Sequence, residues 1–190
     1  MSTVIDGVDY GPLAQLIGTW WGDRGLDIAP EPDGEDSEAY YDSITFTPSG
    51  PADNAEEQDL VSLRYHQVVR KRANGRIFHD QVGHWIYEPA TGLIAHSLTI
   101  PRGVVLLAGG ELKTEGDASI FTVKAEMGSE TFGIAQTPFM LEKARTTAFH
   151  MEMRVEGDEL SYNETTFLDI YGRKFEHKDR AKLQRVMYDI

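Results

Sequence analysis

Histidine is the residue type in this sequence with the most adaptable chemistry: there are six histidines and no cysteine. A neutral imidazole can act as a general acid or base, ligate a metal ion directly or ligate the iron of a haem. The absence of cysteine excludes disulfides, thiolate metal sites and thiol catalysis. The sequence has no phosphate-binding glycine loop, nucleophile elbow or zinc-binding His-Glu-x-x-His helix, which disfavours the common nucleotide and hydrolase chemistries. The histidines are therefore the first candidates for a functional site.

Alternation along the surrounding segments sorts these histidines by the face on which they lie. His66 and His150 share their parity with charged residues, which predicts an outward position. His96 shares its parity with aliphatic residues, so its imidazole should point inward and need a hydrogen-bonding partner. His79 and His84 lie on opposite parities of one segment, and alternation alone does not decide which of them faces the interior.

The elements that must position these side chains are strands. From residue 40 onward, apolar and polar residues alternate, with glycine, proline or acidic turn clusters about every ten residues. Only residues 13–17 and 138–143 are typical of helices, and both segments are too short to cover a sheet. The sequential hairpins favour a closed barrel over a sandwich. We predict an all-β protein with a single closed antiparallel up-and-down β-barrel of about ten strands and a short N-terminal helix, in one domain over residues 1–190.

A barrel with more than about eight strands is wider than its own side chains can fill, so it leaves a ligand-sized cavity. A cavity of this kind predicts the binding of a small molecule. Arg102 lies between a proline and a glycine at a strand connection, where it could sit at the mouth and pair with an acidic group. The acidic runs at residues 31–38 and 53–59 contain turn formers and are predicted to be solvated loops.

The overall charge excludes several classes of partner. The 190 residues have a formal net charge of −13, which repels phosphate backbones and anionic headgroups. No apolar stretch reaches the length of a membrane span, and the N-terminus lacks the pattern of a signal peptide. We expect a cytoplasmic protein that binds neither nucleic acid nor membranes, with a homodimer as a possible assembly.

Several segments resemble a known family. Residues 13–22, Leu-Ala-Gln-Leu-Ile-Gly-Thr-Trp-Trp-Gly, resemble the opening of the nitrobindin family, the haem-binding domain also found at the C-terminus of THAP4. Residues 78–83 and 92–96 are similar to two further segments of that family. The last strand of the family begins with the histidine that ligates haem iron, and His177 with the following Ala181, Leu183 and Arg185 looks like that pattern.

This resemblance implies a ten-stranded barrel related to fatty-acid-binding proteins and lipocalins. It implies haem b as the cofactor, His177 as the proximal iron ligand and His79 as a distal pocket residue. His96 would replace a pocket glutamine, and Phe167 and Leu168 would lie near the pocket wall. The implied activity is the binding of nitric oxide or related nitrogen oxides and, if the protein is an enzyme, peroxynitrite isomerisation.

Two other functions stay open at this point. The first is a non-haem carrier of a fatty acid or another apolar ligand, with His96 and Arg102 as polar anchors. The second is a histidine-lined enzyme of unknown reaction. It requires an inward imidazole paired with an acid such as Asp80, Glu164 or Asp179.

Overall fold

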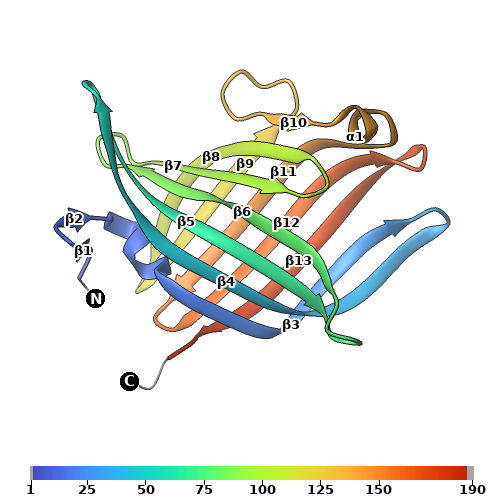
Figure 1. Ribbon diagram of the computed structural model, residues 1–190, viewed down its shortest axis with the longest axis horizontal. Helices are drawn as coiled ribbons and strands as arrows, with labels where there is room; N and C mark the ends of the chain where they lie inside the picture. Colours follow the sequence, from blue (N-terminus) through green and yellow to red (C-terminus); the bar gives the residue numbers. More distant parts are fainter. Residues whose placement is uncertain (1, 188–190) are drawn as a thin grey trace.

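The computed structural model describes residues 2–187 and contains a closed antiparallel β-barrel (Figure 1). Ten strands, β3 to β9 and β11 to β13, form the barrel in the order β8-β7-β6-β5-β4-β3-β13-β12-β11-β9, and pairing of β8 with β9 closes it. The short strand β10 pairs with β8 alongside this closure. The predicted fold class is therefore confirmed. The strands are β1 Val4–Ile5, β2 Val8–Asp9, β3 Gly18–Glu31, β4 Gly34–Ala55, β5 Gln58–Lys71, β6 Ile77–Glu88, β7 Leu93–Ile100, β8 Val104–Glu115, β9 Ala118–Glu126, β10 Ile134–Gln136, β11 Ala144–Glu156, β12 Glu159–Ile170 and β13 Arg173–Arg185.

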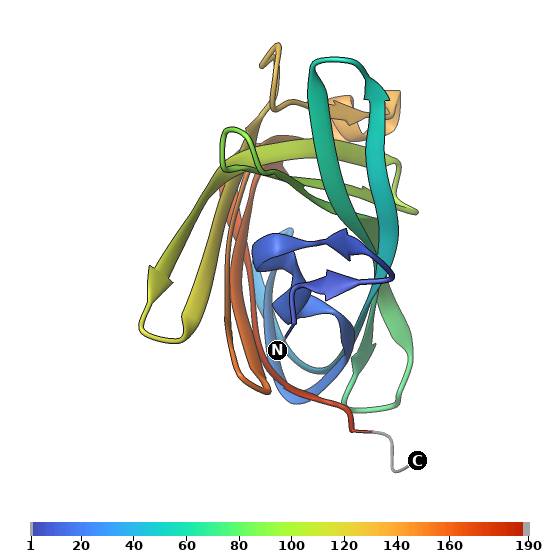
Figure 2. The ribbon, with the colours of Figure 1, turned by 90° about the vertical axis from the view of Figure 1, so that its left-hand side faces the viewer.

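Two short helices lie where the sequence predicts them. The 3-10 helix η1, Gly11–Leu16, has a proline in its first turn, as does the α-helix α1, Pro138–Lys143. Helix η1 lies across one end of the barrel (Figure 2), with Leu13 and Leu16 completely buried. The indole N–H of Trp20 donates to the Leu16 carbonyl at 2.7 Å and holds this helix against β3. Helix α1 lies near the opposite end, beside the turn between β12 and β13 (Figure 1).

The two acidic runs are not loops, and this prediction is wrong. Residues 34–38 of the first run and 53–55 of the second belong to β4, whose first residues pair with the end of β3 and whose last residues pair with the start of β5. Only short turns at residues 32–33 and 56–57 interrupt the ladders. The side chains are largely exposed, as predicted, because these extensions run past the packed part of the barrel. Backbone pairing continues there although the side chains are acidic, since the ladder needs no buried side chain.

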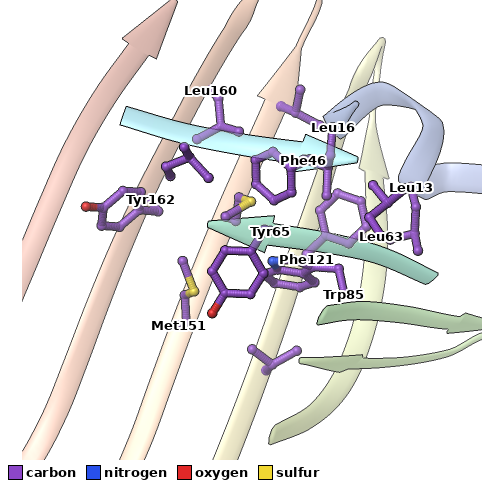
Figure 3. Packing of buried hydrophobic residues seen from close by; sticks show 14 of the residues in the cluster. Leu13, Leu16, Phe46, Leu63, Tyr65, Trp85, Phe121, Met151, Leu160 and Tyr162 are labelled. Atoms are coloured by element: carbon purple, nitrogen blue, oxygen red, sulfur yellow. The ribbon is translucent and has the colours of Figure 1, made fainter. Parts of the chain in front are cut away.

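Large apolar side chains fill the end of the barrel that η1 covers. Phe46, Leu63, Trp85 and Phe121 are all at most 1% exposed, and Figure 3 shows them converging between the strands. Their contribution to stability follows the apolar area that they remove from water. Because this packing occupies the η1 end, open space inside the barrel lies toward the α1 end.

Within the described residues, no helix is both long enough and apolar enough to cross a membrane.

Candidate functional site

The open part of the barrel is a cavity of about 510 Å³ whose two sides differ in chemistry. The apolar side comes from β7 and β8, where Leu98 pairs with Leu106 and Ile100 pairs with Val104. Phe139 of α1 lines the mouth and is 60% exposed. A cavity of this size can enclose a small organic molecule.

The opposite side is lined by three carboxylates and an imidazole, which we call the acidic wall: Asp27 of β3, Glu164 of β12, and His177 and Asp179 of β13. Strand pairing sets Asp27 directly across from Asp179, and Asp179 directly across from Glu164. The three carboxylates therefore form one row across three neighbouring strands. Like charges at directly opposed positions of a sheet are destabilising.

The imidazole of His177 is held within this row. Its Nε2 donates to Asp27 Oδ1 at 2.6 Å and lies 3.4 Å from Asp179 Oδ2. Burial alone would lower the pKa of His177, but the hydrogen bond to Asp27 and the charge of Asp179 outweigh it and raise the pKa above 6.5. The structure thus favours a protonated His177 that faces two carboxylates.

The other two carboxyls of the acidic wall are pushed toward their neutral forms. Burial raises the pKa of Glu164 well above its usual range, and the neighbouring Asp179 raises it further. Burial also raises the pKa of Asp179, although the charge of His177 opposes this change. Glu164 and Asp179 therefore hold their protons to a higher pH than exposed carboxyls do, and the charge of His177 is what opposes this shift.

A buried polar network lies next to the acidic wall. Asp42 is 1% exposed, and its Oδ2 accepts hydrogen bonds from the Tyr162 hydroxyl at 2.7 Å and from Gln67 Nε2 at 3.0 Å. Burial raises the pKa of Asp42 to about 7, while these bonds oppose the rise. The hydroxyl of Tyr40 lies 2.9 Å from that of Tyr162, and the ring of Tyr40 occupies the space that a side chain at Gly25 would fill. The network fixes Tyr162, which also lines the cavity.

His79 and His96 belong to a separate chain of hydrogen bonds. His79 lines the cavity, and its Nε2 lies 3.1 Å from Gln81 Oε1. Gln81 Nε2 donates to the Tyr65 hydroxyl at 2.6 Å, and that hydroxyl lies 2.9 Å from His96 Nε2. His96 is completely buried and stacked on Trp85 with ring centroids 4.4 Å apart. Burial lowers the pKa of His96 to about 3, so this imidazole is neutral.

The structure brings together only part of the residue set predicted from the sequence. His79, Leu168 and His177 line the cavity, and Arg102 lies at its mouth. His96 has the inward position and the partner that its parity predicts, but it belongs to the core and not to the cavity lining.

Phe167 requires a correction. The inward residues of β12 have even numbers, from Tyr162 to Ile170, so Phe167 faces outward. There its ring packs edge-on against the outer His150, with centroids 4.9 Å apart.

Sequence reasoning missed Asp27 and Asp42. In β3, a bulge between Gly22 and Gly25 shifts the alternation, so that Trp20 and Asp27 both point inward although their parities differ. Asp42 did carry a signal, because it shares the parity of buried aromatic and aliphatic neighbours.

The sequence model of the THAP4-like, heme-binding beta-barrel domain matches residues 9–185. The chain belongs to this family. The crystal structure of Rv2717c from M. tuberculosis has the same fold, with a TM-score of 0.69 and 22% sequence identity over 92% of this chain and 95% of that chain. No curated protein sequence is similar enough to this chain to count as a match. The family resemblance drawn from the sequence is confirmed.

The family is a haem-binding domain, so the surroundings of His177 must be compared with what a haem iron requires. The macrocycle occupies four positions of a haem iron, so ligation through Nε2 of His177 would displace Asp27 Oδ1, which lies 2.6 Å from that nitrogen, instead of keeping it as a second ligand. Breaking this contact would leave the Asp27 side chain, which is 8% exposed, without its imidazole, at a cost of about 3–5 kcal/mol for a buried pair. The other nitrogen, Nδ1, is bonded to Cγ, the ring carbon that joins Cβ, so it lies nearer to the backbone than Nε2 and has less room beside it for a macrocycle. The arrangement around His177 does not fit a haem iron.

Proposed function

We propose that this member of the family binds a small organic molecule in the cavity without a bond between iron and His177. The observation that carries the proposal is the division of the cavity into an apolar side and an acidic wall. The apolar side favours a ligand with an apolar body, which gains about 25 cal/mol for each Å² removed from water. The acidic wall selects the polar end of the ligand.

Haem b, with nitric oxide or a related nitrogen oxide at the open iron position, is the competing function. The family supports it, and the exposed Arg102 at the mouth suits a propionate. Against it stands the occupied Nε2 of His177. A simple fatty-acid carrier is disfavoured for another reason, because its carboxylate or its tail would have to face the acidic wall.

A pair of adjacent leucines on β8 provides the test of cavity binding. Leu106 points inward and is 4% exposed, whereas Leu107 points outward and is 38% exposed. Leu106→Trp fills the cavity and should weaken the binding of a neutral fluorescent dye such as Nile red at least about tenfold, as expected when a close-packed site loses its space. Leu107→Trp should leave the dye affinity unchanged. Equal dye affinities in the two variants would refute binding in the cavity.

Titration with haemin decides between the two functions. We expect the Soret band of the wild type and that of His177→Ala to coincide, since His177 is held by Asp27. A band typical of histidine ligation that is lost in His177→Ala would establish haem b binding through this residue and overturn our proposal.

A further inference from the structure

The acidic wall has no lysine or arginine paired with its carboxylates in the described part of the chain. Three carboxylates, Asp27, Asp179 and Glu164, line one side of the cavity in a single row across β3, β13 and β12. Within residues 2–187, no lysine or arginine forms an ion pair with any of them, although Arg102 and Lys143 line the same cavity, and His177 is the partner with which Asp27 and Asp179 pair. Enclosed charges in proteins are usually paired or bound to metal ions. Protonation of the carboxyls is one way to compensate such a row, and a bound metal ion is the other.

The donor atoms of the wall are close enough to share one ion. The imidazole nitrogen of His177 and one carboxylate oxygen each from Asp27 and Asp179 all lie within 4.8 Å of one another. Around a first-row metal ion with ligand bonds of about 2.0–2.2 Å, neighbouring donors lie roughly 3 Å apart. The observed separations of 2.6 Å and 3.4 Å from His177 Nε2 bracket that distance. The donors also come from paired strands, which fix their spacing.

We propose that Asp27, His177 and Asp179 bind a divalent transition-metal ion directly, with Glu164 beside it, and that this ion is not the iron of a haem. One imidazole with two carboxylates suits Zn²⁺, Fe²⁺ or Mn²⁺ better than Ca²⁺ or a thiolate-seeking ion. The ion takes the place of the Nε2 proton, so His177 loses that proton on binding and the solution gains it. Asp27 and Asp179 keep their contacts to His177 through the metal.

The metal also defines the ligand class, and this part rests on the function proposed above. Three protein ligands leave coordination positions that face the cavity. With the ion bound, the wall attracts oxygen donors, whereas the bare wall repels them. An apolar molecule with a carboxylate or an enolate-type oxygen then fits both sides of the cavity.

The exposed pair of His66 and Asp80 offers a matched control for the test. It is also a histidine and an aspartate on neighbouring strands, 3.2 Å apart, but on the outer surface. The untagged, chelator-treated wild type should bind one equivalent of Zn²⁺ by calorimetry and develop visible d–d bands with Co²⁺. His177→Ala and Asp179→Asn should weaken Zn²⁺ binding at least about tenfold, and His66→Ala should not change it. Asp179→Asn keeps the side-chain volume and removes a repelling charge, so this variant should keep its fold. Far-UV circular dichroism verifies that a loss of Zn²⁺ binding in this variant does not come from unfolding.

Three outcomes would overturn the proposal: no Zn²⁺ bound by the wild type, equal losses in His66→Ala and His177→Ala, or Co²⁺ bands that survive in His177→Ala. Binding of neutral Nile red to the metal-free protein is independent of this result, so failure of the metal site and failure of cavity binding are distinguishable. A fluorescent fatty acid should bind only after Zn²⁺ is added. Equal binding of the fatty acid with and without Zn²⁺ would refute the predicted ligand class.

Discussion

Two histidine–aspartate pairs of this barrel have the same chemical composition but different surroundings. His66 and Asp80 join β5 and β6 on the outer face, with side chains 53% and 41% exposed. His177 and Asp27 join β13 and β3 inside, with side chains 30% and 8% exposed. An exposed pair contributes about 0–1 kcal/mol, because water screens it and competes for its hydrogen bonds. The enclosed pair has little water to replace either partner, so its chemistry is determined by the neighbouring carboxylates.

Removal of the imidazole should give the largest difference in stability between the two pairs. His177→Ala leaves Asp27 buried without its partner and should lower the free energy of unfolding by about 3–5 kcal/mol. His66→Ala should lower it by no more than about 1 kcal/mol. Urea denaturation of both variants at pH 7 measures the contrast. Equal losses would mean that enclosure does not distinguish the two pairs.

Asp42 extends the comparison to a buried carboxyl whose partners are neutral. Its pKa is about 7 in the folded protein and near 3.8 in the unfolded chain, so the folded protein holds an extra proton between about pH 4 and about pH 7. Stability therefore falls as the pH rises through this window, by up to about 1.4 kcal/mol for each pH unit. The raised pKa of His177 acts in the same direction above 6.5.

The variant Asp42→Asn mimics the protonated carboxyl, so it should come closest to the wild type at pH 3, where the wild-type carboxyl is protonated in both states, and be the more stable protein at pH 8. Denaturation series at the two pH values provide the measurement. In Asp42→Asn the free energy of unfolding should fall less steeply with rising pH than in the wild type. The fall should not vanish, since Glu164 and Asp179 also bind protons more tightly in the folded state. An unchanged slope would show that Asp42 is not the group responsible.

The smallest expected effect concerns the hydrogen-bonded chain that ends at His96. Tyr65→Phe leaves Gln81 and His96 without a shared partner and should cost about 1–3 kcal/mol of stability. Tyr65 does not line the cavity, so Nile red affinity should stay within about twofold, a change under about 0.5 kcal/mol. Tyr171→Phe, at an exposed hydroxyl, is the control for stability. A tenfold loss of dye affinity in Tyr65→Phe would place this chain within the binding site.

Much of the fold was predictable, because strand alternation and turn residues report burial on one face. The barrel, both short helices and the inward position of His96 followed from that pattern. The acidic wall was not predictable in the same way. Asp27 reaches it through a bulge that reverses the parity of β3, and no local pattern reveals that Asp27 pairs with Asp179. Cytoplasmic location and a homodimer stay predictions.

The pairing of β3 with β13 determines when the acidic wall can exist during synthesis. Asp27 and His177 are 150 residues apart in the sequence, and they meet on the first and last strands of the barrel. A nascent chain on the ribosome can form the hairpins from β4 to β9 early, because their contacts are local. It gains the wall only when the last strand emerges and joins β3. Capacity to bind at this wall is therefore confined to chains that contain both β3 and β13, and a product truncated before β13 retains barrel strands without the site.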